Sequence, residues 1–152
     1  HYVVRLAAEK AQACFAKLQS DGADIYPVLA ADTTVSVDGR ILGKPQEDEE
    51  AFQMLSAMSG RCHEVHTGIA VATREGVTTA ISTTRVEMAE WSDAKILAYV
   101  ATGEPRDKAG AYGIQGLAST MIKRIEGSYS GVMGLPIYET AMLLEQAGIR
   151  IL

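Results

Sequence analysis

The sequence predicts one α/β or α+β domain with a mixed sheet. Segments with the spacing of amphipathic helices alternate with apolar or alternating segments typical of strands, and at least two strand pairs are adjacent in the chain. A chain of 152 residues is long enough to bury a core, and 47% hydrophobic with 22% charged residues is ordinary for a globular protein. No linker, repeat or low-complexity segment divides the chain, so we expect residues 1–152 to form a single domain.

The first part of the chain predicts a helix, a strand and a hairpin. Residues 26–31 form an apolar run without alternation, which predicts a buried strand. Asp38-Gly39, between the short apolar segments 35–37 and 40–42, is a strong hairpin signal. Before them, apolar residues at steps of three and four form the stripe of a helix that ends near Ser20–Gly22; they are Val4, Ala8, Ala11, Phe15 and Leu18.

Proline, glycine and capping residues divide the rest of the chain into further elements. Acidic residues after Pro45 suit the positive end of a helix dipole, and Ser92 is a good N-cap. The elements expected in order are a helix over 47–59, strands over 64–73 and 77–90, a helix over 92–102, an irregular segment over 106–120, a strand over 121–126 and a helix over 136–147.

Charge and cysteine content exclude several classes of protein. The formal net charge is −5 and no cluster of Lys and Arg stands out, which argues against a nucleic-acid partner. No apolar run approaches the ~20 residues that a membrane-spanning helix needs, so no membrane partner is expected. Cys14 and Cys62 have no paired spacing, which favours free thiols in a reducing compartment and a cytoplasmic location.

Asp32 and Lys44 are the first candidates for chemistry. Asp32 follows an apolar strand, where a carboxylate can bind a divalent cation or take a proton from water. Taken by itself, the residue favours an Asx turn onto Thr33 or Thr34 over either role. Pro45 holds Lys44 extended, which suits a phosphate contact, although a solvated strand-end lysine is also common. The intervening hairpin predicts that Asp32 and Lys44 lie near each other.

The segment DKAGAYGIQG (107–116) is the third candidate. Its glycines recur at every third position and let the backbone approach a ligand, while Tyr112 and Gln115 can stack on or hydrogen-bond to a flat heterocycle. A packed irregular turn explains the pattern equally well. The spacing is neither a dinucleotide fingerprint nor a P-loop.

Two other motifs are rejected as catalytic sites. In HEVH (63–66) the histidines are three apart on an expected strand and point to opposite faces, so structural or cross-strand roles are favoured over a zinc site. In GSYSG (127–131) a tyrosine stands where a nucleophile elbow needs serine.

Several stretches, in order, resemble the Maf family of nucleoside triphosphate pyrophosphatases, once described as septum-formation inhibitors. The glycine-rich form is similar to the branch acting on dTTP and UTP rather than on 7-methyl-GTP. The matching stretches are YVVRLAAEKA (2–11), AADTTVSVDGRILGKP (30–45), MLSAMSGRCHEVHTG (54–68), YVATGEPRDKAGAYGIQG (99–116) and GSYSGVMGLPIYET (127–140).

The resemblance implies a mixed α/β fold related to inosine triphosphate pyrophosphatases, with a long central sheet flanked by helices and a cleft. It implies hydrolysis between the α and β phosphates, assisted by Mg²⁺ or Mn²⁺, and a homodimer is a further expectation. Asp32 matches the catalytic acid that activates water or holds the metal. Lys10 and Lys44 match phosphate-side lysines, Thr33 and Gln115 match positions linked to base selection, and Lys108 shares their motif with a less defined role.

Members of that family begin with a strand and an S-x-S-P-R-R loop that contacts the triphosphate. This chain starts at His1, in an expected helix, so the resemblance implies an N-terminally truncated domain that hydrolyses dTTP poorly. Two alternatives remain open from the sequence. One is a nucleotide-binding regulator of cell division without essential catalysis, and the other is a phosphatase that releases single phosphates.

Overall fold

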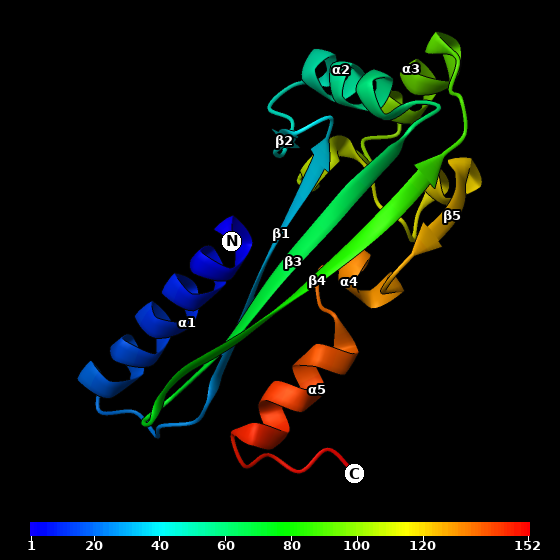
Figure 1. Ribbon diagram of the computed structural model, residues 1–152. Helices are drawn as coiled ribbons and strands as arrows, with labels where there is room; N and C mark the ends of the chain where they lie inside the picture. The colour runs from blue at the N-terminus through cyan, green and yellow to red at the C-terminus, as the bar shows by residue number, and fades with distance from the viewer.

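The computed structural model describes residues 1–152 and is built on one long five-stranded sheet with helices on both faces (Figure 1). The strand order is β2-β1-β3-β4-β5. The strands are β1 (Val28–Val37), β2 (Arg40–Leu42), β3 (Cys62–Thr73), β4 (Gly76–Met88) and β5 (Ile122–Glu126). The helices are α1 (Tyr2–Ser20), α2 (Asp48–Met58), α3 (Asp93–Ala101), α4 (Tyr129–Met133) and α5 (Ile137–Gln146), with 3₁₀ turns at Ala109–Ala111 and Leu117–Met121.

The predicted α/β class, with an elongated sheet flanked by helices, is confirmed. The sheet itself is antiparallel at every pairing rather than mixed. Two of the four pairings are tight hairpins, which can join only antiparallel strands. The predicted Asp38-Gly39 turn is one of them, and both residues have positive φ, 49° and 75°, as its geometry requires.

Strand β1 differs most from its prediction. The expected strand over 26–31 and the first strand of the hairpin form one continuous strand that passes through Asp32. β1 pairs with β3 over residues 28–36 but with β2 only over 35–37. Residues 28–34 therefore lie at an edge of the sheet and are half-buried, except for buried Thr34, rather than forming the fully buried strand predicted.

Helix α1 packs closely against one face of the sheet. Its buried residues recur at steps of four, and Val4, Ala8 and Leu18 of the predicted stripe are only half-buried. A Cβ on Gly68 of β3 would lie 2.5 Å from backbone atoms of Val3 and Val4, so only glycine allows this approach. The buried residues of α1 are Val3, Ala7, Ala11 and Phe15.

The opposite face is covered by α4 and α5, and the main core lies at one end under α2 and α3 (Figure 1). Leu143 of α5 packs on Ile69 and Val71 of β3. Ser92 caps α3 as predicted, accepting a hydrogen bond from the Lys95 amide at 3.2 Å. None of the helices has the length and apolar character needed to cross a membrane.

Candidate functional site

A cavity of about 540 Å³ lies beside the edge of β1 and contains every site residue predicted from the sequence. Its wall is built by α1, β1, the segment after β2, the glycine-rich segment and the end of α4. The predicted residues that line it are Lys10, Asp32, Thr33, Lys44, Lys108 and Gln115. Asp32 and Lys44, which we expected to lie near each other because of the hairpin, line the same cavity.

The edge position of β1 explains how neighbouring residues reach the same cavity. Successive side chains on a strand point to opposite faces, so Asp32 lies on the α1 side of the sheet and Thr33 on the α4 side. Because no strand pairs with β1 on its outer side here, both side chains reach the cavity. Asp32 therefore stands in the middle of a strand, whereas the sequence placed it at a strand end.

Asp32 is held by an ion pair with α1. Lys10 Nζ lies 2.5 Å from Asp32 Oδ1, and the side chains are 55% and 18% exposed, respectively. The Asx-turn alternative is not what the structure shows, because the partner of this carboxylate is Lys10 rather than the amide of Thr33 or Thr34. The pair uses Oδ1, which leaves Oδ2 for a second partner.

Glu104 fixes the glycine-rich segment. Its Oε1 accepts a hydrogen bond from the Leu117 amide at 3.0 Å, and its main-chain carbonyl accepts one from Lys108 Nζ at 2.8 Å. The Gly110 amide also donates to the carbonyl of Gly43 at 3.1 Å, which ties the segment to the residue before Lys44. These bonds bring the segment to the cavity while Gln115 itself stays exposed and forms no side-chain hydrogen bond.

Tyr112 lines the cavity but is not available to stack on a heterocycle as predicted. It is 5% exposed, and its hydroxyl lies 2.6 Å from Nε2 of buried His63. Burial lowers the pKa of His63 to about 4 and raises the pKa of Tyr112 above its usual range. Both groups are therefore uncharged near neutral pH, and the contact anchors the glycine-rich segment to β3.

The structural role predicted for the histidines is consistent with this geometry. His66 lies on the face opposite His63, and its Nδ1 is 3.0 Å from the hydroxyl of Thr83, the residue paired with it on β4. No group of three or more His, Cys, Asp or Glu side chains in the chain could hold a metal ion on its own. Cys14 and Cys62 are free thiols, as predicted.

Sequence reasoning missed Glu104 and the end of α4 among the lining residues. Val132, Met133 and Gly134 reach the cavity because α4 packs over the sheet next to Thr33 and Thr67. The sequence feature that could have predicted α4 is Ser128. Its side chain caps the helix by accepting a hydrogen bond from the Gly131 amide at 2.9 Å. Nothing in the local sequence marks the Glu104 side chain, whose hydrogen bond goes to the amide of Leu117, 13 residues further along the chain.

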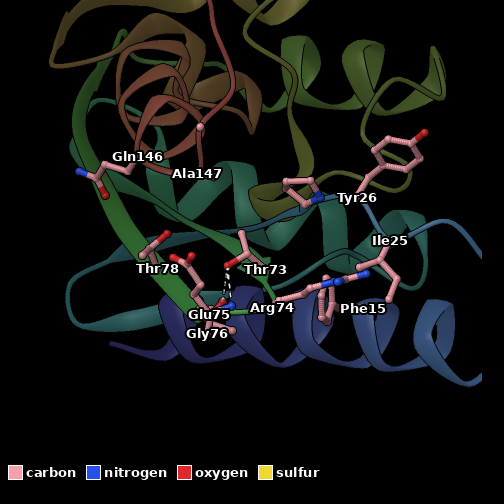
Figure 2. A pocket seen from close by; sticks show the side chains of 13 residues that line it. Phe15, Ile25, Tyr26, Thr73, Arg74, Glu75, Gly76, Thr78, Gln146 and Ala147 are labelled. Carbon is pink, nitrogen blue, oxygen red and sulfur yellow. Dashed lines mark hydrogen bonds between the residues drawn. The ribbon is translucent and has the colours of Figure 1, made fainter.

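A second cavity of about 580 Å³ lies at the other end of the β3–β4 hairpin (Figure 2). It is bounded by the hairpin turn, the end of α1 and the end of α5, and its charged side chains, Arg74 and Glu75, belong to the exposed turn. Thr73 and Glu75 bond to each other within the turn rather than converging on the cavity. We therefore take the cavity at the β1 edge as the candidate site.

Comparison with known proteins agrees with the resemblance noted in the sequence. The family model described as Maf-like protein matches residues 1–147. A dTTP/UTP pyrophosphatase of Methylobacillus flagellatus is 67% identical over 150 residues, which cover 99% of this chain and 74% of that protein. A dTTP/UTP pyrophosphatase of Nitrosomonas europaea is 49% identical, covering 99% and 72%. A nucleoside triphosphate pyrophosphatase of Haemophilus ducreyi is 46% identical over 151 residues, covering 99% and 77%. With most of its length matched at these identities, the chain belongs to the Maf-like protein family.

Proposed function

We propose that this protein is a hydrolase that converts nucleoside triphosphates, with dTTP and UTP as the main substrates, into the nucleoside monophosphate and pyrophosphate. The observation that carries the proposal is the gathering of Asp32, three lysines and Gln115 around one cavity. The relatives named dTTP/UTP pyrophosphatases support the choice of substrate. Their names give no support to a purely regulatory role.

The lysines supply the charge that a triphosphate needs. Lys10, Lys44 and Lys108 line the cavity from three separate segments of the chain. Phosphoryl transfer depends mainly on positioning and on neutralising the phosphate oxygens. Lys108 keeps two ammonium protons for a phosphate after its bond to the Glu104 carbonyl.

Asp32 is the proposed catalytic group, as general base or as metal ligand. It contributes a carboxylate that can accept the proton of an attacking water at Oδ2 while Oδ1 stays with Lys10. A single carboxylate also fits Mg²⁺ or Mn²⁺, because Mg²⁺ is commonly held by one or two carboxylates together with substrate phosphates and water. When bound, such an ion would neutralise charge on the phosphates.

The experiment is a product analysis on the native protein with Mg²⁺ or Mn²⁺ and a panel of triphosphates. We expect pyrophosphate as the first product from UTP and dTTP, whereas orthophosphate as the first product would contradict the proposal. Asp32→Asn should lose at least about 100-fold in kcat, the contribution of a general base, while still binding UTP. Asp24→Asn is the matched control, because Asp24 is an exposed carboxylate outside the cavity.

Mn²⁺ binding separates the two roles of Asp32. If the carboxylate holds the ion, Asp32→Asn weakens Mn²⁺ binding in the presence of UMP and pyrophosphate, measured by electron paramagnetic resonance. If Asp32 acts only as the base, Mn²⁺ binding is unchanged and only turnover falls.

A further inference from the structure

Three groups on the α4 side of the sheet form a continuous chain of hydrogen bonds that ends at the cavity. Thr33 on β1 and Thr67 on β3 are directly paired across the strands, and their hydroxyl oxygens are 2.8 Å apart. The Thr67 hydroxyl is also 2.8 Å from the main-chain carbonyl oxygen of Gly131 in α4. Thr67 is completely buried, whereas Thr33 lines the cavity.

The chemistry of these groups fixes the direction of each hydrogen bond. A carbonyl oxygen can only accept, so the single hydroxyl proton of Thr67 is donated to Gly131. Thr67 has no second proton, and the bond to Thr33 therefore takes its proton from the Thr33 hydroxyl. Thr33, which lines the cavity, therefore has its hydroxyl proton already committed to Thr67.

We infer that Thr67 makes Thr33 an acceptor-only group in the cavity, so that the part of the nucleotide meeting Thr33 must be a hydrogen-bond donor. This inference rests on the proposed function and adds a positioning residue to it, because Thr67 is buried and does not reach the cavity. Without the Gly131 carbonyl as a fixed acceptor, either threonine could donate to the other, and Thr33 could present its proton instead.

Two donors are common to UTP and dTTP. One is the N3–H of uracil or thymine, and the other is the 3′-hydroxyl of the sugar. Cytosine differs at the first of these, because its N3 carries a lone pair. A Thr33 hydroxyl that only accepts would place lone pair against lone pair at cytosine N3, and an unpaired polar group in a site is a strong source of discrimination. The arrangement thus favours uracil and thymine without any charged group at the base.

Thr67→Val is the decisive change. Valine matches the shape of threonine but can neither donate nor accept, so the Thr33 proton is released while the packing is kept. The Gly131 carbonyl still accepts from the Gly134 amide at 3.1 Å, so the substitution leaves no orphaned carbonyl. Thr67→Ser restores the hydroxyl, and Thr84→Val is the matched control, since Thr84 is equally buried and bonds to the start of α4 at Ser128.

The measurement is the dissociation constant of α,β-methylene analogues of UTP, CTP and 3′-deoxy-3′-fluoro-UTP with Mg²⁺, determined by calorimetry so that turnover is not required. In Thr67→Val we expect the preference for the donor-bearing nucleotide to shrink about tenfold, the value of one neutral hydrogen bond. If the donor is N3–H, the UTP-to-CTP ratio shrinks, mainly because CTP binds better. If it is the 3′-hydroxyl, the ratio of UTP to 3′-deoxy-3′-fluoro-UTP shrinks instead, because the released Thr33 proton can then be donated to the fluorine, which cannot itself donate.

The other variants distinguish an effect of Thr67 on the Thr33 hydroxyl from a general loss of structure. Thr67→Ser and Thr84→Val should keep both ratios, and adding Thr67→Val to Thr33→Val should change neither ratio further. Equal weakening of all three analogues in Thr67→Val, or unchanged ratios, would overturn the inference while leaving the proposed function intact. A wild-type protein that binds none of the analogues would overturn the proposed function, and this inference with it.

Discussion

The ammonium nitrogen of Lys10 lies 2.5 Å from Oδ1 of Asp32, joining the middle of α1 to the middle of β1 at the cavity wall. The Lys10 side chain is 55% exposed, so the pair adds little to stability. The pair lines the same cavity as Lys44, Lys108 and Gln115, so we expect it to affect ligand binding more than stability.

Replacing Lys10 with methionine should therefore separate binding from stability. We expect the free energy of unfolding to change by less than about 1 kcal/mol, as for an exposed ion pair, while KM for UTP rises at least about tenfold, because a charge-assisted phosphate contact is lost. Urea unfolding and steady-state kinetics measure the two effects. Lys17→Met, an exposed lysine on the same helix away from the cavity, should change neither.

Gly68→Ala should destabilise the fold by about 3 kcal/mol, the upper range for overpacking a core. The added methyl would lie 2.5 Å from the backbone of Val3 and Val4, and backbone moves less readily than a flexible side chain. Because Gly68 pairs directly with Asp32, a displaced α1 also carries Lys10 away from the carboxylate, and UTP affinity should fall.

Gly43→Ala is the control for stability. A Cβ there meets no atom within 4 Å, and its φ is not in the left-handed region. Equal free energies of unfolding for the two variants, measured with urea, would contradict the close packing of α1 on β3.

The stability of the protein should fall in mild acid because of His63. Burial lowers the pKa of His63 from its usual value of 6.5 to about 4, so the unfolded chain binds a proton in this range and the folded chain does not. The free energy of unfolding is therefore highest above pH 6.5 and decreases by up to about 3 kcal/mol as the pH falls toward 4.

Urea unfolding at several pH values between about 7 and 4.5 tests this. Titration of the carboxylates also changes the free energy of unfolding in this range, but it does so equally in the wild type and the variant. His63→Gln cannot titrate, so its unfolding free energy should fall less over the same range. An identical slope in the two proteins would show that His63 is not the group responsible.

Glu104→Ala should loosen the segment that carries Gln115. The substitution removes the acceptor of the Leu117 amide but leaves the main-chain bond to Lys108. We expect faster hydrogen exchange at Leu117 and about a tenfold loss in kcat/KM for UTP, the value of one charged hydrogen bond. Glu104→Gln keeps an acceptor oxygen and should retain most of the protection. Slow exchange at Leu117 in the alanine variant would show that Glu104 does not hold this segment.

The local sequence was sufficient for most elements. The Asp38-Gly39 turn, the Ser92 cap and the apolar spacing in α2 depend on neighbours within a few residues, so they can be predicted without the fold. α4 was missed because it has only five residues, too few to show a helical period.

The sequence by itself determined which residues to look at. Asp32, Lys44 and Gln115 were named from their local pattern, and Lys10, Thr33 and Lys108 from the resemblance to the family. All six line one cavity. Only the tertiary structure decided how they meet. β1 is an edge strand over residues 28–34, so side chains from opposite faces of the sheet, Asp32 and Thr33, reach the same space. Three of the contacts described above join residues that are 22 to 64 positions apart, and no local pattern encodes contacts at that separation. They are Lys10 with Asp32, His63 with Tyr112, and Thr67 with Gly131.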